Sequence, residues 1–452
     1  MNSEVFVQLV FLVAALAPLG SGCSKMSSPG QALSSGPSLS AVPLVQNNVV
    51  TIGCILDLTG PEELEGRSQQ AAINLAVQDL VAELAQQGSS ISVQVVFGDS
   101  QSKPERAQTL LDQMTQQGIR MFVGPNSDAE IAWVSDYATD LGVIMISPAS
   151  TSPTLNEFPS LYRIAKNDLF QAKVAVLLMQ KDGVLDLFEF ARKDVYGSQL
   201  ASNIDAELKK IGGVQNPPTF YDLSRRDFSG VLEDFQDAIR NEILRVGSAS
   251  SIGIHLSAFS EAESILEQAG QLVLDSKDAA FGQVHWYGSD GMNELQGALT
   301  NPAVADFMMA RDMHVVSFAV PKEDRPAYNE FAARINANAG LSPDVYVAAA
   351  YDALMLAAKG SIAAGPNTTD FSEWRKALET YAATAHGLTG DLAFDQNGDR
   401  KVGSYANWKL QKLPAAGEAA NPNAGQSKAP GRIAEWVVES YLVCDENSCQ
   451  AQ

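Results

Sequence analysis

The stretch Val49-Val-Thr-Ile-Gly-Cys-Ile-Leu56 is almost wholly apolar, and a long amphipathic segment, Gly66–Ala85, follows it. An uninterrupted apolar run of this length is typical of a strand that is buried on both faces of a parallel sheet. The second segment repeats apolar side chains at helical spacing between Ile73 and Leu84, which predicts a helix with one buried face. A buried strand that leads into an amphipathic helix is the repeating unit of an α/β fold.

The same unit recurs along the first third of the chain. Further strands are predicted at Val93–Phe97, Met121–Val123 and Val143–Ile146. Between them we expect two helices, the first opened by Ser102 and Pro104 and the second at Ala129–Leu141. This alternation predicts a parallel sheet that is covered by helices on both faces.

Strand–helix alternation resumes near Tyr162 and continues to about Gly288, which predicts a second α/β lobe. A third stretch, Ala303 to Ala385, holds a predicted strand at His314–Ala319 and a long helix around Tyr346–Lys359.

The pattern changes after Gly390. Three segments there have the pattern of antiparallel strands: Asp391–Phe394, Tyr405–Leu410 and Ile433–Tyr441. The run Pro414–Gly431 is rich in Ala, Pro, Asn and Gly, and we expect it to be a disordered loop. Asp395-Gln-Asn-Gly-Asp399 departs from a calcium-binding loop in the place of its glycine and in its twelfth residue, so we interpret it as a turn.

The composition limits the possible partners. The 452 residues are 46% hydrophobic and 19% charged, as in a globular chain long enough for two domains. The formal net charge of −22 excludes nucleic acid as a partner, because no basic face could neutralise its phosphates. The charge is spread along the chain, which favours a role in solubility over recruitment of a cationic partner.

The N-terminal segment predicts export. Val5–Leu19 is apolar but short for a membrane-spanning helix, so we favour a signal peptide although no Lys or Arg precedes it. Leu19-Gly-Ser-Gly-Cys23 resembles a lipobox, so residues 1–23 are predicted to be a signal peptide with a lipobox. Cys23 would become the lipidated N-terminus, and its acyl chains would anchor the mature protein to a membrane face. An ordinary signal peptide that is cut near this point is the alternative. Residues 24–47, rich in Ser, Pro and Gly, are predicted to form a flexible tether.

The remaining cysteines and the histidines provide no catalytic signature. Cys444 and Cys449 lie close together in a polar tail, residues 444–452, where an oxidising compartment favours a disulfide. Cys54 lies inside an apolar strand and is interpreted as a buried hydrophobic residue. GxSxG, P-loop, GxGxxG and HExxH motifs are absent from the sequence. We therefore expect no enzyme activity, no cofactor and no metal site.

Two strand-to-helix turns place polar residues at the carboxyl end of the predicted sheet. The first is Gly124-Pro-Asn-Ser-Asp128. The second, Ile146–Leu155, is called the hydroxyl loop here because it holds Ser147, Ser150, Thr151 and Ser152. Ligands of open α/β sheets bind at this end, and hydroxyl groups, which both donate and accept, suit a small zwitterion. Taken alone, these residues are better explained as caps and turn residues.

Taken together, these segments and several others resemble one family over residues 49–411. The matching segments are Ile52–Gly60, Gly124-Pro125, Ile146–Pro153, Asp194–Gly197, Trp286–Gly291, Ala349–Asp352, Gly387–Gly390 and Phe394–Asp399. Their order is similar to the Leu/Ile/Val-binding branch of the type I periplasmic binding proteins, the extracytoplasmic subunits of ABC importers.

The resemblance implies two Rossmann-like lobes with parallel sheets, joined by three crossovers, that close on a ligand held between them. Lobe one would comprise residues 48–167 and 299–388, and lobe two residues 168–298 and 389–443. The closed form would dock on an ABC permease. The protein would be periplasmic or at the cell surface, with only its lipid anchor in the membrane.

The resemblance also implies roles for particular residues. Ala149 and Thr151, with Ser150 between them in the hydroxyl loop, would hold the head group of an amino-acid-like ligand. Tyr196 and Phe259 would cover the ligand, with ordinary packing as the alternative for each. Asp290 would pair with the ligand ammonium, because a buried cation without a partner is costly, or it is merely a turn residue.

Two positions depart from the family pattern. Where the family has a serine that binds the ligand carboxylate, this chain has Asp128, with Ser127 one place earlier. Asp128 would repel a carboxylate if it faces the ligand, or it caps the next helix and leaves Ser127 to bind. Glu65 stands where amino-acid binders often have an aromatic residue, and an acid facing the ligand there would favour a cationic or polyhydroxylated solute. An exposed surface position is the commoner place for a glutamate.

Two functions follow as hypotheses. The first is a solute-binding lipoprotein of an ABC importer, for an amino acid or a related small polar solute. The second is a ligand-sensing or regulatory lipoprotein of the same fold that has no role in transport.

Overall fold

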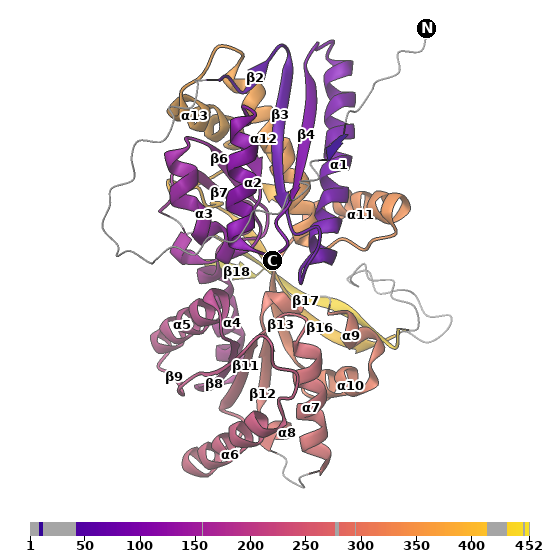
Figure 1. Ribbon diagram of the computed structural model, residues 1–452. Coiled ribbons are helices and arrows are strands. Elements are labelled where there is room, and N and C mark those ends of the chain that lie inside the picture. Colours follow the sequence, from indigo (N-terminus) through magenta and orange to yellow (C-terminus); the bar gives the residue numbers. More distant parts are fainter. Residues whose placement is uncertain are drawn as a thin grey trace, which may run out of the picture.

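The computed structural model describes residues 9–11, 42–155, 157–275, 280–293, 295–413, 432–445 and 448–451. The predicted lipidation site Cys23, the tether up to residue 41 and the predicted loop Pro414–Gly431 lie outside these residues. The described chain forms two lobes, one built from the N-terminal strands and the other from the middle of the chain (Figure 1).

Lobe one contains a seven-stranded sheet in the order β1-β4-β3-β5-β6-β7, with β2 antiparallel to the outer part of β3. Its strands are β1 (Leu9–Phe11), β2 (Val45–Gln46), β3 (Val49–Leu56), β4 (Ser92–Asp99), β5 (Met121–Val123), β6 (Ile144–Ser147) and β7 (Leu161–Arg163). Its helices are α1 (Glu63–Gln86), α2 (Pro104–Gln116), α3 (Asp128–Asp140), α12 (Val345–Ala364) and α13 (Phe371–Ala382). The parallel pairing along the path of this sheet confirms the alternation predicted from the sequence.

Lobe two contains a nine-stranded sheet in the order β10-β8-β11-β12-β13-β16-β17-β18, with β9 beside β8. Its strands are β8 (Asp186–Arg192), β9 (Val214–Gln215), β10 (Thr219–Tyr221), β11 (Ile252–Ser257), β12 (His285–Gly288), β13 (His314–Ala319), β16 (Gly403–Lys412), β17 (Ala434–Cys444) and β18 (Cys449–Ala451). Its helices are α4 (Asp168–Asp182), α5 (Val195–Lys210), α6 (Ser229–Val246), α7 (Ala262–Asp275), α8 (Ala280–Gln283), α9 (Gln296–Thr300) and α10 (Pro302–Ala310). The last three strands are antiparallel, and a disulfide joins Cys444 to Cys449 across β17 and β18.

Two expectations are corrected. β13 was expected in lobe one, within residues 299–388, but it pairs in parallel with β12 and antiparallel with β16 of the second sheet. The sequence pattern identifies a strand but not its pairing partner, which is set by non-local packing. Ser102 does not cap helix α2; Lys103 is the N-cap residue and Pro104 takes the first helical position.

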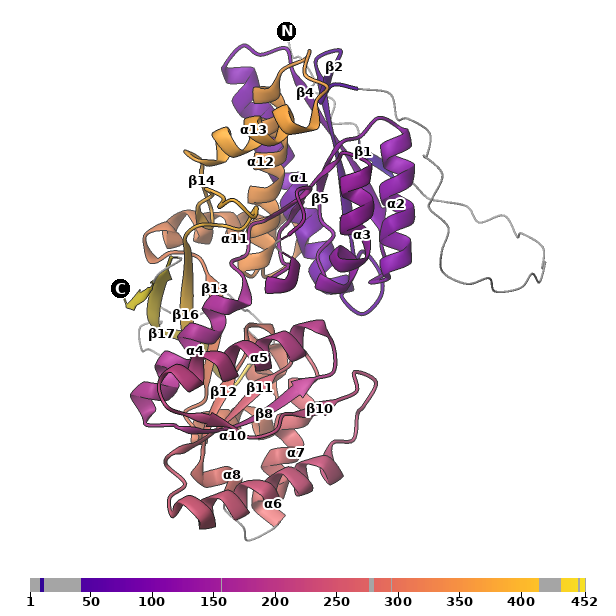
Figure 2. The same ribbon diagram turned by 90° about the vertical axis from the view of Figure 1, so that its left-hand side faces the viewer.

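Within the described residues, the chain crosses between the lobes three times (Figure 2). The first crossing leads from β7 to α4. The second leads from β13 through η3 (Lys322–Asp324) to α11 (Arg325–Ala339), and the third from β14 (His386–Gly387) and β15 (Gly390–Asp391) to β16. Because each lobe is built from segments on both sides of a crossing, the lobes can rotate relative to each other only by bending these segments.

Helix α12 is the most apolar helix of lobe one. By length and composition alone it is the one helix among the described residues that could cross a membrane. However, 67% of its most apolar window is buried inside the protein, where it contacts α1, α13 and the first sheet. Its composition is therefore explained by its place in the core of lobe one.

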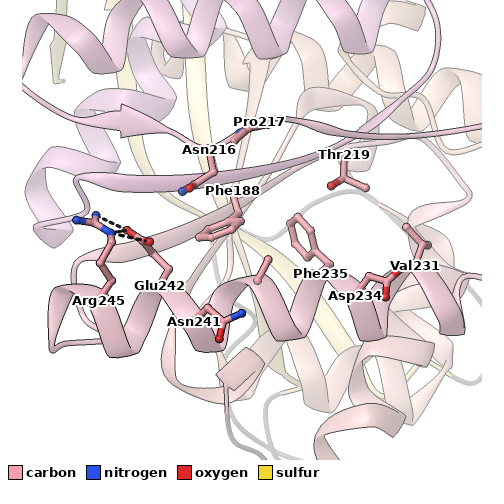
Figure 3. A pocket seen from close by; sticks show the side chains of 11 residues that line it. Phe188, Asn216, Pro217, Thr219, Val231, Asp234, Phe235, Asn241, Glu242 and Arg245 are labelled. Atoms are coloured by element: carbon pink, nitrogen blue, oxygen red, sulfur yellow. Dashed lines mark hydrogen bonds and ion pairs between the residues drawn. The ribbon is translucent and has the colours of Figure 1, made fainter.

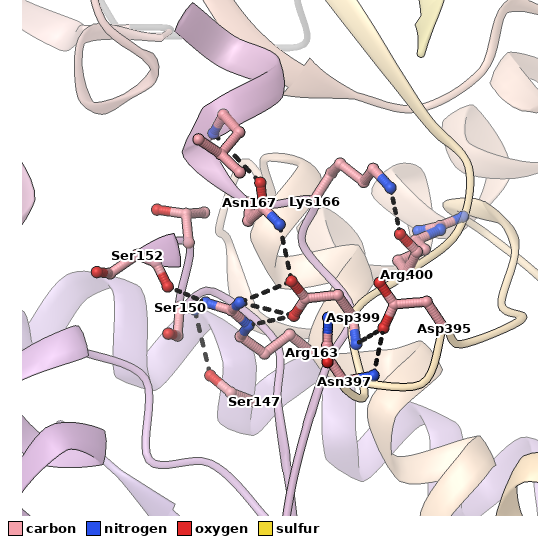
Figure 4. Close-up of polar contacts among 12 residues, drawn as sticks. Ser147, Ser150, Ser152, Arg163, Lys166, Asn167, Asp395, Asn397, Asp399 and Arg400 are labelled. Atoms are coloured by element: carbon pink, nitrogen blue, oxygen red, sulfur yellow. Dashed lines mark hydrogen bonds and ion pairs between the residues drawn. The ribbon is translucent and has the colours of Figure 1, made fainter. Parts of the chain in front are cut away.

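Arg163, at the end of β7, is fully buried at the first crossing (Figure 4). Its guanidinium pairs with both oxygens of Asp399, at 2.7 and 2.8 Å, and also donates to the carbonyl of Ser152. Asp399 also accepts a hydrogen bond from the side chain of Asn167 at 2.7 Å. The segment Asp395–Asp399 is a turn, as predicted, because Asp395 Oδ1 accepts from the N–H groups of Asn397 and Asp399 at 2.8 and 3.0 Å. Through Asp399 it joins the first and third crossings to the hydroxyl loop.

Replacing Asp399 with Asn should lower the free energy of unfolding by about 3–5 kcal/mol, because the buried Arg163 then loses its counter-charge. Equilibrium unfolding in urea measures this loss. Glu63→Gln is the matched control, since it breaks the exposed Glu63–Arg67 pair and should cost less than about 1 kcal/mol. Equal, small losses in both variants would show that the Arg163 contact is not a structural constraint.

Candidate ligand-binding site

Ser127, not Asp128, is the N-cap of helix α3. Ser127 Oγ accepts a hydrogen bond from the Glu130 N–H at 3.3 Å, and the Glu130 carboxylate accepts one from the Ser127 N–H at 3.4 Å. This reciprocal pair is a capping box. The Ser127 hydroxyl also donates to Glu130 at 2.8 Å, so it is engaged at the helix end.

The Asp128 carboxylate turns toward the hydroxyl loop. Its Oδ1 accepts hydrogen bonds from Ser150 Oγ at 2.6 Å and from the backbone N–H groups of Thr151 and Ser152, both at 3.2 Å. Ser150 and Thr151 are buried, and Ala149 beside them is half-buried. Three donors that converge on one carboxylate oxygen form an anion site. The anion held at this site is the carboxylate of Asp128 itself.

Thr151 connects the hydroxyl loop to lobe two. Its hydroxyl donates to Asp168 Oδ2 at 2.9 Å, and its carbonyl accepts from the Asp168 N–H at 2.9 Å. Asp168 is the first residue of α4, where the positive end of the helix dipole favours a carboxylate. Gln171, one turn later, donates to Asp168 Oδ1 at 2.8 Å.

Asp290 receives hydrogen bonds from both lobes. It begins the short helix η2 (Asp290–Met292), just beyond β12. Tyr196 of α5 and Tyr346 of α12 both donate their hydroxyl groups to its carboxylate. Its own N–H donates to Gln171 Oε1 at 2.9 Å. A continuous chain of hydrogen bonds therefore runs from Asp128 through Thr151, Asp168 and Gln171 to Asp290.

The predicted aromatic residues pack beside Asp290. The rings of Tyr196 and Phe259 have centroids 4.9 Å apart, and the Arg192 guanidinium lies 3.8 Å from the Phe259 centroid. The Phe259 ring packs directly on the backbone of Gly291. Only glycine allows this contact, because a Cβ at position 291 would stand 1.9 Å from the ring. The rings are thus fixed by each other, and a role in covering a ligand stays a prediction.

Glu65 belongs to a second polar network on helix α1. Its Oε1 accepts from Gln69 Nε2 at 2.7 Å, and Gln69 Oε1 accepts from Asn126 Nδ2 at 2.5 Å. Asn126 is only 7% exposed, yet its Oδ1 has no hydrogen-bond partner among the residues that the structure describes. Burial and the nearby Asp344 raise the pKa of Glu65 well above its usual range.

The electrostatics of the region between the lobes are strongly negative. Burial, followed by the charges of Asp290 and Asp128, raises the pKa of Asp168 well above its usual range. Burial also raises the pKa of Asp128, against the opposing effects of Ser150 and Arg163. Arg163 is already paired with Asp399 and offers little compensation. Such a site is stabilised by protons or by an added positive charge.

Sequence reasoning found part of this network. Of the predicted residues, five belong by hydrogen bonds to the chain that leads from Asp128 to Asp290: Asp128, Ser150, Thr151, Tyr196 and Asp290. It missed Asp168, Gln171 and Tyr346. The sequence Asn167-Asp168 after a predicted strand is a helix-start signal, so it could have located Asp168 at the carboxyl end of the sheet. Tyr346 also lies in the first turn of a helix, after the capping Asp344, but that signal does not indicate that the helix end faces lobe two.

A surface hollow lies elsewhere, on lobe two (Figure 3). It has a volume of about 590 Å³, and Phe188 and Phe235 form its apolar floor. None of the predicted site residues lines it. Its rim pair, Arg245 and Glu242, is already joined by an ion pair, with Arg245 65% exposed. Polar groups do not converge in it as they do between the lobes, so we assign no ligand to it.

A family model described as the receptor family ligand binding region matches residues 68–412. The chain belongs to this family. It is 24% identical to Leu/Ile/Val-binding protein homolog 1 of Brucella suis over 394 residues. This alignment covers 84% of this chain and 96% of that protein. The predicted membership of the Leu/Ile/Val-binding-protein-like family is confirmed.

Solved structures share the fold of this family member. A branched-chain amino acid substrate-binding protein, LivJ of Streptococcus pneumoniae, in complex with isoleucine, matches with a TM-score of 0.61 and 20% identity, over 86% of this chain and 99% of that one. An R. palustris solute-binding protein in complex with 4-hydroxybenzoate matches with a TM-score of 0.68 and 14% identity, over 88% and 98%. The type I periplasmic binding protein fold is therefore confirmed.

Glu130, in the capping box beside Asp128, predicts a pH effect on stability. Burial and the neighbouring Asp57 raise its pKa from the usual 4.5 to about 7. Between these two values the folded state binds a proton that the unfolded state has lost, so stability falls as the pH rises through this range. Glu130→Gln should remove about 2 kcal/mol of this loss between pH 5 and pH 8.

Urea unfolding of both proteins at the two pH values measures this difference. The exposed Glu105→Gln, also in the first turn of a helix, is the control and should leave the pH dependence unchanged. A Glu130→Gln protein that keeps the wild-type pH dependence would contradict the assignment.

Proposed function

We propose that this chain is the extracytoplasmic solute-binding lipoprotein of an ABC importer. It binds an amino acid or a related small polar solute between its two lobes, and the closed form docks on the permease. The observation that carries this proposal is the chain of hydrogen bonds from Asp128 to Asp290. It connects both lobes and includes Thr151 and Asp290, for which the family resemblance implies ligand contact.

The relatives support binding rather than catalysis. Homologues that match this chain are named as Leu/Ile/Val-binding proteins, and one fold neighbour holds isoleucine while another holds 4-hydroxybenzoate. A fold that accommodates both an aliphatic amino acid and an aromatic acid sets the architecture of the site but not the solute. The solute must therefore be argued from this chain's own residues.

Export and anchoring complete the proposal. Lipidation at Cys23, followed by the tether of residues 24–47, would hold the lobes at a membrane face close to a permease. The alternative, a sensing lipoprotein, requires the same solute site with a different partner. Neighbouring permease and ATPase genes favour import, and a chain encoded without them favours sensing.

A thermal-shift screen of the purified protein tests solute binding directly. The screen covers amino acids, amides, amines and small organic acids at millimolar concentration. A specific solute raises the melting temperature because it binds only the folded state. If no compound of any class raises it, solute binding is contradicted for both functions.

The bound solute should depend on Asp290 and on Thr151, whose hydroxyl positions Asp168. Thr151→Ala and Asp290→Ala should each weaken its binding by about 1–3 kcal/mol, the cost of leaving a buried polar partner unpaired. Isothermal titration with the best compound from the screen gives the affinities, and Thr139→Ala on the far part of α3 is a threonine control. Unchanged affinity in both site variants would remove the head-group assignment.

A further inference from the structure

The hydroxyl loop, which the family resemblance assigns to the solute head group, has its donors already occupied. Ser150 Oγ and the N–H groups of Thr151 and Ser152 all point to Asp128, and the Thr151 hydroxyl points to Asp168. A solute carboxylate that entered this loop would find no free donor among these groups. It would also meet the Asp128 carboxylate at close range, and repulsion between like charges in a poorly solvated region is costly.

Asp168 and Asp290, in contrast, favour a positively charged group. Asp168 and Asp290 are 1% and 7% exposed, and Gln171 bridges them. The hydrogen bonds that hold them come from neutral groups, which are two tyrosines, a threonine, a glutamine amide and the backbone N–H of Gly291. Neutral donors orient carboxylates without compensating their charge, so a cation added here gains the attraction that the protein leaves unused.

Asn126 provides an independent sign of a missing hydrogen-bond donor. Its Oδ1 is buried and has no partner, although its amide nitrogen is anchored to Gln69 in the network that includes Glu65. Buried polar atoms are nearly always paired, and an unpaired acceptor is satisfied by a donor. An ammonium or amide N–H of a solute is such a donor, whereas a carboxylate is not.

A metal ion is not the cation that this geometry fits. Within the described ranges, no three His, Cys, Asp or Glu side chains converge closely enough to hold one. The carboxylates are spread along a chain of hydrogen bonds instead, which suits an extended organic solute with separate N–H groups.

We propose that the solute is an organic cation that carries a primary ammonium group and no α-carboxylate, so that Asp168 and Asp290 bind its ammonium while Asp128 keeps carboxylates out of the hydroxyl loop. This inference rests on the proposed function and narrows it from amino acids to amines and related cations. Specificity arises both from the attraction at Asp168 and Asp290 and from the repulsion at Asp128.

Matched solutes test the inference. Each series keeps one hydrocarbon group and changes the charged groups attached to it: isoamylamine, L-leucine and isocaproate; phenethylamine, L-phenylalanine and hydrocinnamate; putrescine, γ-aminobutyrate and succinate. Titration calorimetry and thermal shift are measured on the wild-type protein at neutral pH. In at least one series the amine should bind about tenfold more tightly than the amino acid, with the acid weakest.

The inference is overturned if, in every series with a binding compound, the amino acid or the acid binds more tightly than the amine. That result would leave solute binding itself intact. If no compound of the nine binds, the inference is overturned, and the wider screen decides separately whether solute binding itself survives.

Variants at Asp128 separate two effects: the negative charge of its carboxylate, and the occupation of the loop donors by its oxygen. Asp128→Ser vacates the two backbone donors, so it should bind the amino acid of the best series at least about tenfold more tightly than wild type does. Asp128→Asn keeps an oxygen on those donors, so it should weaken the amine without that gain. Asp136→Asn, an exposed position on the same helix, is the control and should change neither affinity.

An Asp128→Ser protein that folds, by an unchanged circular dichroism spectrum, and still rejects the amino acid would contradict the role of Asp128. If that variant does not fold, Asp128→Asn and the wild-type series decide. An amine affinity in Asp128→Asn equal to that of wild type would show that the charge at this position does not select the solute.

Discussion

The buried contact between Arg163 and Asp399 is the constraint on which the arrangement of the site depends. The guanidinium takes both oxygens of Asp399 and the carbonyl of Ser152, and so ties the end of the third crossing to the hydroxyl loop. Asn167 adds a further bond to Asp399, directly before helix α4. The loop of lobe one and the first turn of lobe two's helix α4 are therefore fixed to one point. This geometry places Thr151 within hydrogen-bond distance of Asp168.

The same contact shapes the electrostatics. Arg163 lies close enough to Asp128 to oppose the rise in its pKa, but its charge is matched by Asp399. The three carboxylates between the lobes are therefore oriented by neutral donors and left without a full counter-charge. Buried carboxylates without a counter-charge lower the stability of the unliganded protein. Such arrangements occur chiefly at functional sites, where a bound ligand supplies the missing charge. The unpaired oxygen of Asn126 fits the same pattern.

The sequence predicted the parallel sheets and many strands, such as His314–Ala319, because apolar periodicity is a local property. It placed that strand in the wrong lobe, since pairing with β12 and β16 is determined by distant parts of the chain. It left open whether Asp128 faces the ligand or caps helix α3, and it did not predict that Ser127 is the cap. The structure shows that Asp128 accepts three hydrogen bonds from the hydroxyl loop, while Ser127 caps the helix. Asp168 and Tyr346 join the site only through the meeting of the lobes, which no local pattern encodes.

The central claim is that the solute is held between the lobes by carboxylates while Asp128 remains in the hydroxyl loop. A crystal structure of the protein with its tightest-binding amine tests this claim most directly. It should show the ammonium within hydrogen-bond distance of Asp168 or Asp290, with Asp128 still accepting from Ser150, Thr151 and Ser152. A solute carboxylate seated on those loop donors with Asp128 displaced, or a solute bound at the Phe188–Phe235 hollow of lobe two, would contradict it.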